Sequence, residues 1–142
     1  MLMRFLVTLL FLPQLMLQVS GQTDSIPPAP PLLERVSINY QTGFAELKWI
    51  PGTSADVAGY VIYSFRNNEG YAIDTIHDPY ATGYIYRQAA SAFFSDTFVV
   101  AAIDSSVNTS PLSNALRTIY TNAVTDTCRK LIRLKWNSYI SA

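Results

Sequence analysis

The chain has 142 residues but only one cysteine and one histidine. Cys128 has no second cysteine with which to form an internal disulfide, and His77 cannot supply a multi-histidine metal site. The sequence also lacks an excess of either charge, because ten basic residues balance ten acidic ones. A chain without a cationic field does not collect phosphates. We therefore expect no metal, no cofactor and no nucleic-acid partner.

The sequence also lacks a recognisable catalytic motif. His77 stands beside Asp78, but both lie in the turn-like stretch "HDPY", and no serine lies in a G-x-S-x-G sequence. Cys128 would need a histidine brought close to it before it could act as a nucleophile. We expect a protein that is not an enzyme.

The first 21 residues differ in composition from the rest. "MLMR" supplies a positive charge, "FLVTLLFLPQLMLQV" is an apolar run of fifteen residues, and small residues follow near Gly21. A helix that spans a bilayer needs roughly twenty residues, and Pro13 interrupts this run. We predict a signal peptide over residues 1–21. After its cleavage, the chain would be secreted, extracellular or on the cell surface, with no membrane insertion.

A proline-rich segment follows the predicted signal peptide. Four of the five residues from Pro27 to Pro31 are prolines, which remove backbone donors and hold the chain extended. We expect a stiff lead-in over residues 22–31 and a domain that begins at residue 32.

From residue 32 the hydrophobic pattern changes to a period of two. Ala45, Leu47 and Trp49 alternate with Glu46 and Lys48 in one of several such runs, and clusters of Gly, Pro, Asn, Asp and Ser separate the runs. The pattern predicts strands at 34–40, 44–50, 59–65, 71–76, 84–88, 97–104 and 115–121. Seven short strands without a helical stretch are typical of an all-β, antiparallel two-sheet sandwich, and a barrel is the alternative.

Three of these runs resemble a fibronectin type III domain: "LKWIPG", "GYVIY" and "TFVVAAIDSSVNTSPLS". The resemblance covers about residues 29–121 and implies a domain at 32–121 with an immunoglobulin-like sandwich. It places a core tryptophan on the second strand. An immunoglobulin domain proper is disfavoured, because it would want two cysteines between its sheets. The structural core is expected to include Leu47, Trp49, Tyr60, Ile62, Phe98, Val100 and Ala102.

The chain departs from this family at Phe98. Fibronectin type III domains usually carry a tyrosine there, whose hydroxyl bonds back to the backbone at the corner between the fifth and sixth strands. Phenylalanine keeps the ring and loses the hydrogen bond. We expect the same topology with a slightly looser corner.

The tripeptide Leu-Lys-Trp occurs twice, and its tryptophans, Trp49 and Trp136, are the only two in the chain. They lie 87 positions apart (136 − 49), which is about one domain length. Apart from a chance match, this spacing indicates one structural position in consecutive modules. Residues 122–142 would then be the linker and first strands of an incomplete second domain in a truncated chain. We expect this tail to be frayed or loosely packed, prone to aggregation, and to leave Trp136 much more exposed than Trp49.

The segment "TDTCRKLIRLKWNSY" resembles junctions in gliding-motility-associated surface proteins of the Bacteroidota that leave the cell by type IX secretion. Cys128, Leu134 and Trp136 mark the second repeat in this resemblance, and Asn137 and Tyr139 also fit it. The resemblance implies a stalk or adhesin-like extracellular protein.

Two functions stay open. The first is a non-catalytic extracellular structural or adhesion module, whose partners are neighbouring fibronectin-like domains. The second is a spacer or accessory domain of a secreted hydrolase. The sequence does not identify the protein or glycan ligand that such a module would bind. The one candidate row of sugar-binding aromatics is Tyr80, Tyr84 and Tyr86, but Tyr84 and Tyr86 share a strand face, and this favours their partial burial.

Overall fold

The computed structural model describes residues 24–66, 69–88 and 94–139. The predicted signal peptide lies outside these residues. Strands make up the regular structure of the described part, and none of its residues forms a helix that could cross a membrane.

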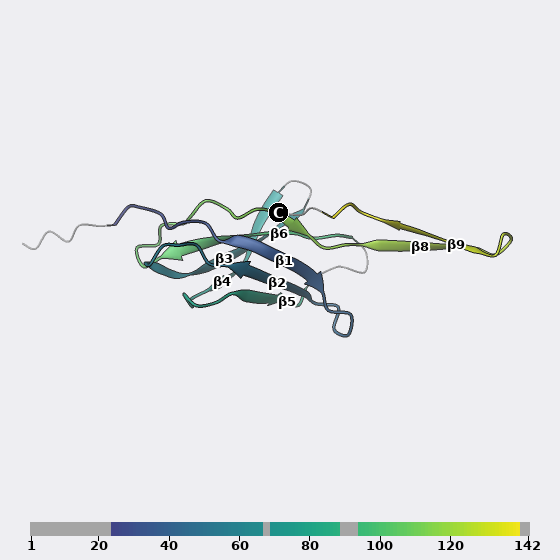
Figure 1. The fold of residues 1–142 in the computed structure, drawn as a ribbon, viewed down its shortest axis with the longest axis horizontal. Coiled ribbons are helices and arrows are strands. Elements are labelled where there is room, and N and C mark those ends of the chain that lie inside the picture. Colours follow the sequence, from purple (N-terminus) through teal and green to yellow (C-terminus); the bar gives the residue numbers. More distant parts are fainter. Residues whose placement is uncertain (1–23, 67–68, 89–93, 140–142) are drawn as a thin grey trace, which may run out of the picture.

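Two antiparallel sheets face each other in a sandwich (Figure 1). One sheet has three strands in the order β1-β2-β5, and the other has four in the order β4-β3-β6-β7. The seven strands are β1 (Leu32–Ile38), β2 (Ala45–Ile50), β3 (Val57–Arg66), β4 (Glu69–Ile76), β5 (Gly83–Tyr86), β6 (Thr97–Asp104) and β7 (Leu116–Arg117). The predicted all-β antiparallel sandwich is confirmed.

The period-two pattern of the sequence explains which side chains turn inward. On β2, Ala45, Leu47 and Trp49 are buried, whereas Lys48 and Ile50 are exposed. The central strands β3 and β6 are apolar on both faces, and every residue of β6 after Thr97 is buried. Strands covered on both faces read as nearly continuous apolar runs, as "FVVAAI" does.

The core lies between the sheets. Trp49 is 1% exposed and its ring centroid lies 5.2 Å from that of Tyr60 on the opposite sheet. Nearer the other end of the sandwich, Tyr86 meets Phe98 edge to face at 5.7 Å. Within the core cluster are all seven side chains expected there: Leu47, Trp49, Tyr60, Ile62, Phe98, Val100 and Ala102.

The strand ends differ from those predicted by pattern. Tyr40 continues the alternation of β1 but is 90% exposed, because its neighbours Gln41 and Thr42 donate their amides to Asn39 Oδ1 and start the turn. The last strand of the sandwich is short. Beyond Arg117, Thr118 keeps the register of β7 on β6 and donates its amide to the Asp96 carbonyl over 2.9 Å, but the Asp96 amide donates to the Thr118 side chain, at Oγ1.

The proline-rich lead-in packs against the sandwich at Pro28, Ala29 and Pro31. Pro28 and Pro31 are buried, and the Ala29 amide donates to Ser54 Oγ over 2.8 Å. The packing is close enough that a Cβ on Gly52 would lie 2.4 Å from the Ala29 carbonyl oxygen. The packed unit therefore begins earlier than the expected boundary at residue 32, because the prolines are themselves part of the buried apolar surface.

One asparagine ties β1 to the loop before β7. Asn114 Oδ1 accepts the Leu33 amide over 2.8 Å, and Asn114 Nδ2 donates to the Leu33 carbonyl over 2.9 Å. These two hydrogen bonds satisfy the backbone N–H and C=O of Leu33, whose side chain is fully buried.

We expect Asn114→Ala to destabilise the sandwich by about 2 kcal/mol, because two backbone groups lose their partner together. Urea denaturation followed by circular dichroism measures the change. Asn122→Ala, at an exposed position outside the sandwich, is the control. Equal midpoints for the two variants would show that the Asn114 pairing contributes nothing.

The last two strands form a unit of their own. β8 (Thr121–Asp126) pairs antiparallel with β9 (Leu131–Trp136) and with no strand of the sandwich. In Figure 1 this hairpin extends beyond the end of the sandwich. Two strands are present where the linker and first strands of a further domain were expected. The expectation of a frayed tail was wrong for the paired residues, because β8 pairs with β9 along its whole length. Trp136 is 67% exposed, so the predicted contrast with Trp49 is confirmed.

Candidate functional site

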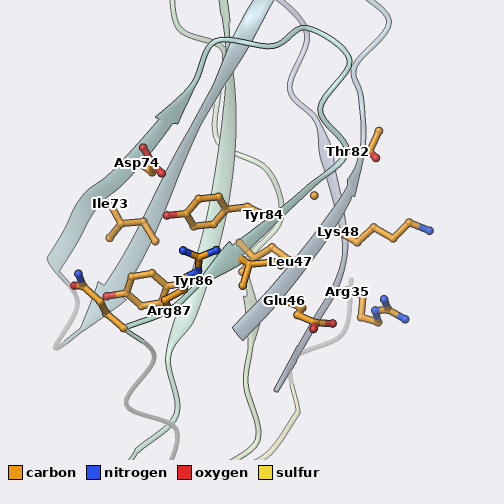
Figure 2. Close-up of a pocket in the computed structure, with 13 residues that line it drawn as sticks. Arg35, Glu46, Leu47, Lys48, Ile73, Asp74, Thr82, Tyr84, Tyr86 and Arg87 are labelled. Carbon is orange, nitrogen blue, oxygen red and sulfur yellow. The ribbon is translucent and has the colours of Figure 1, made fainter. Parts of the chain in front are cut away.

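A groove of about 1100 Å³ opens along the edge of the sandwich where β5 and β4 are the outer strands of their sheets. Figure 2 shows Tyr84 and Tyr86 on one side of the β2–β5 sheet with Ile73 and Asp74 of β4 near them. Charged side chains also line the groove: Arg35, Glu46, Lys48, Asp74 and Arg87. Lys48 is already paired with Glu34, at 3.4 Å between Nζ and Oε2.

The two groove tyrosines are held by the protein itself. Tyr84 and Tyr86 are half-buried and pack against the core cluster. Burial, followed by a hydrogen bond to Asp74 and the charge of that carboxylate, raises the pKa of Tyr84 to about 12. The contact joins β5 of one sheet to β4 of the other, so it closes part of the open edge.

We expect Tyr84 to ionise near pH 12, well above the usual tyrosine value of about 10. Because the folded pKa is raised, the stability that this pair contributes is complete below pH 10 and is lost as the pH rises towards 12. Asp74→Asn removes the charge and should lower the pKa of Tyr84. Tyrosine Cζ resonances followed by NMR through the alkaline range give the value. If the pKa of Tyr84 were the same in Asp74→Asn, the contribution assigned to the Asp74 carboxylate would be contradicted.

The candidate row of sugar-binding tyrosines is not assembled. Tyr80 is 87% exposed in a turn, where its amide donates to Asp78 Oδ1 over 2.9 Å. Tyr84 and Tyr86 are turned inward, as their shared strand face indicated. The three rings therefore present no common flat surface of the kind that a sugar ring stacks on.

The residues weighed as catalytic lie on the surface. His77 and Asp78 are exposed, and the Asp78 carboxylate accepts the Tyr80 amide within its own turn. Cys128 is exposed at the tip of the β8–β9 hairpin. His77 directly follows the end of β4, Asp78 caps the next turn, and Cys128 lies in the hairpin turn.

Three carboxylates approach one another at the lead-in end of the sandwich. Oxygen atoms of Asp24, Asp56 and Asp104 lie within 4.8 Å of one another. Asp104 is buried, which raises its pKa, but the hydrogen bonds from Asn108 and Ser106 outweigh burial and the net shift is downward. These hydrogen bonds stabilise the turn after β6, and this structural role explains why a carboxylate is buried at position 104. Sequence reasoning missed this cluster, because Asp24 and Asp104 are far apart in the chain.

The β8–β9 hairpin has one apolar and one polar face. In its register Ala123 lies opposite Leu134 and Thr125 opposite Ile132, whereas Lys135 lies opposite Asn122. Directly opposed residues share a face, so Ile132, Leu134 and Trp136 line one side, and they are 68%, 54% and 67% exposed. The apolar face has no covering sheet among the described residues.

The comparisons with known proteins show the fold. No family model and no curated protein sequence matches the chain. The solved structure of an Fn3-like protein from Clostridium thermocellum is similar with a TM-score of 0.54 at 18% identity, over 66% of this chain and 93% of that one. The FN1–FN3 domains of chicken CNTN1 give 0.51 at 15% identity, over 78% of this chain and 44% of that one. A beta-1,2-glucanase from Parabacteroides distasonis gives 0.51 at 19% identity, over 66% of this chain and only 14% of the enzyme.

Together with the sheet orders above, these likenesses define an immunoglobulin-like β-sandwich. More particularly, the chain has the fibronectin type III fold.

Proposed function

We propose that this chain is part of a non-catalytic extracellular protein made of consecutive fibronectin type III modules, with a structural or adhesive role. Residues 24–118 form one module, and β8 and β9 are the first two strands of the next. The observation that carries the proposal is the likeness of the β8–β9 hairpin to the β1–β2 pair.

The two pairs have the same pattern. Each consists of strands that follow one another in the chain and pair antiparallel. In the first pair Leu47 and Trp49 face the core, and Lys48 between them faces outward. In the second pair Leu134 and Trp136 share the apolar face and Lys135 lies on the other. The repeated Leu-Lys-Trp therefore has the same alternation in both hairpins.

The two pairs differ in what covers them. Leu47 and Trp49 are covered by the opposite sheet, where Tyr60 and Ile62 are fully buried. The corresponding face of β8–β9 is covered by no other part of the chain that the structure describes. Two strands alone do not hold a fold in water. With six residues in each strand, the apolar face of the hairpin measures roughly 20 Å by 10 Å. Its area is far less than the roughly 800 Å² that each partner buries in a stable interface between separate proteins. A second sheet in the same polypeptide supplies the missing cover most simply.

The surrounding sequence supports an extracellular place for this protein. The charged, apolar and small-residue regions of residues 1–21 have the order of a signal peptide. The resemblance of "TDTCRKLIRLKWNSY" to junctions in gliding-motility-associated surface proteins supports a stalk or adhesin on the cell surface. In that setting the partners are neighbouring modules and a protein or glycan ligand of unknown identity.

A second candidate function is an accessory domain of a secreted hydrolase. It is favoured by the likeness to a small share of a beta-1,2-glucanase, where a fibronectin-like fold accompanies the rest of an enzyme. In this setting the module would act as a spacer next to a catalytic domain.

The size and content of the native polypeptide test the proposal. An antibody against residues 24–118 should detect, in the medium or surface fraction of the source cells, a polypeptide much larger than 15.8 kDa. Mass spectrometry of that band should give peptides of further fibronectin-like modules. A glycosidase or protease sequence would favour the second function. A cytoplasmic product, or one no larger than the chain itself, would contradict both.

A further inference from the structure

We propose that Asn137 forms a hydrogen-bonded joint that fixes the orientation of the β8–β9 hairpin relative to the sandwich. The joint would set the angle between consecutive modules. The inference rests on the proposed function only where it treats the hairpin as part of the next module.

The connection between the two units is very short. β7 ends at Arg117 and β8 begins at Thr121, so only residues 118–120 lie between them. This segment is "TIY" and contains neither glycine nor proline. Flexible linkers are rich in glycine and serine, so the composition does not favour free movement.

The first residue of the connection belongs to the sandwich. Thr118 is 1% exposed and donates its amide to the Asp96 carbonyl over 2.9 Å. Thr118 Oγ1 in turn accepts the Asp96 amide, also over 2.9 Å. Asp96 is itself fully buried next to the start of β6. The Thr118 carbonyl is therefore held at a fixed place on the sandwich.

Asn137 connects this fixed place to the hairpin. It follows Trp136 at the end of β9, and its Nδ2 donates to the Thr118 carbonyl over 3.1 Å. Its Oδ1 accepts the Tyr120 amide over 2.6 Å, and its own amide donates to the Tyr120 carbonyl over 3.4 Å. The planar side-chain amide of Asn137 thus bonds to the first and the last residue of the connection, Thr118 and Tyr120. Two directional hydrogen bonds restrict rotation as well as separation.

The equivalent position in the first strand pair supports a role at the joint. Ile50 follows Trp49 there and is half exposed, with a side chain that can form no hydrogen bond. An asparagine is therefore not needed to end such a pair. Its presence after Trp136 is explained by its contacts with Thr118 and Tyr120.

Electron spin resonance distances measure the joint directly in the 142-residue chain. Cys128, the only cysteine, takes one nitroxide at the hairpin tip, and Thr75→Cys on the exposed face of β4 takes the other. We expect a narrow distance distribution. Asn137→Ala should broaden it, raising the population of other orientations by roughly tenfold because two side-chain hydrogen bonds are lost. Asn137→Asp keeps the acceptor for the Tyr120 amide, loses the donor to Thr118, and should fall between.

Asn122→Ala, on β8 away from the joint, is the matched control and should leave the distribution narrow. Hydrogen exchange of the β8 and β9 amides separates a loosened joint from a melted hairpin; if Asn137→Ala melts the hairpin, Asn137→Asp becomes the deciding variant. A broad distribution in the unmodified chain would overturn the proposal. So would a distribution in the deciding variant as narrow as that of Asn122→Ala. Either result leaves the size of the native polypeptide, and hence the proposed function, to be judged separately.

Discussion

Replacing Trp49 by alanine is expected to lower the free energy of unfolding by about 3–5 kcal/mol, the range for truncation of a large buried aromatic side chain. The indole is 1% exposed and packs on the Tyr60 ring between the two sheets. The substitution would leave a large cavity where the sheets meet. A loss of this size is a large fraction of the stability of one domain. Chemical denaturation followed by far-ultraviolet circular dichroism measures it.

Trp136→Ala is the matched control for this experiment. It removes the same side chain from the same Leu-Lys-Trp sequence, but at a position that is 67% exposed. Exposed positions change stability by about 0.5 kcal/mol or less, so the sandwich should unfold at nearly its original midpoint. Similar losses of unfolding free energy for the two variants would show that Trp49 and Trp136 do not differ in burial.

Gly59→Ala is expected to cost about 3 kcal/mol, at the upper end of the range for overpacking. A Cβ at this position on β3 would lie 2.1 Å from the Ile76 carbonyl oxygen and 3.2 Å from the His77 Cα. Both are backbone atoms, so no side chain can rotate away to make room. The strand pair β3–β4 would have to separate at its end. The thermal unfolding midpoint and the urea midpoint both measure the change.

Gly70→Ala is the control for this substitution, because it adds the same methyl group to β4. Its nearest neighbour would be the end of the Phe65 ring at 2.8 Å, which is a side chain and can shift. We expect a clearly smaller loss than at Gly59. Equal losses would mean that the added methyl group, and not the blocked backbone, determines the cost.

The sandwich could be predicted from the sequence because strands such as β2 alternate between apolar and polar residues, and the central strands β3 and β6 are apolar runs between turn sequences. Leu47 and Trp49 on β2, and Tyr60 and Ile62 on β3, follow a period of two between clear turn sequences. This local pattern decides which face is buried, and the burial of one face fixes the register. It could not define the strand ends, because those depend on hydrogen bonds such as that between Thr118 and Asp96.

The bounds of β8 and the packing of the lead-in could not be predicted in the same way. The stretch "TNAVTD" is largely polar and reads as a linker, but it becomes β8 because β9 offers it an unpaired edge. The prolines of residues 27–31 indicate an extended segment and say nothing of what it packs on. The groove, the joint at Asn137 and the contact of Tyr84 with Asp74 all join residues distant in the chain, which no local pattern shows.

The central claim is that the sandwich is complete by Thr118 and that β8–β9 belongs to a separate unit. Acrylamide quenching of tryptophan fluorescence tests it most directly, with Trp136→Phe reporting on Trp49 and Trp49→Phe reporting on Trp136. The account predicts strong protection of Trp49 and a quenching constant several-fold higher for Trp136, in keeping with exposed fractions of 1% and 67%. Equal protection of the two tryptophans would show that the hairpin is packed into the sandwich, and would contradict the account.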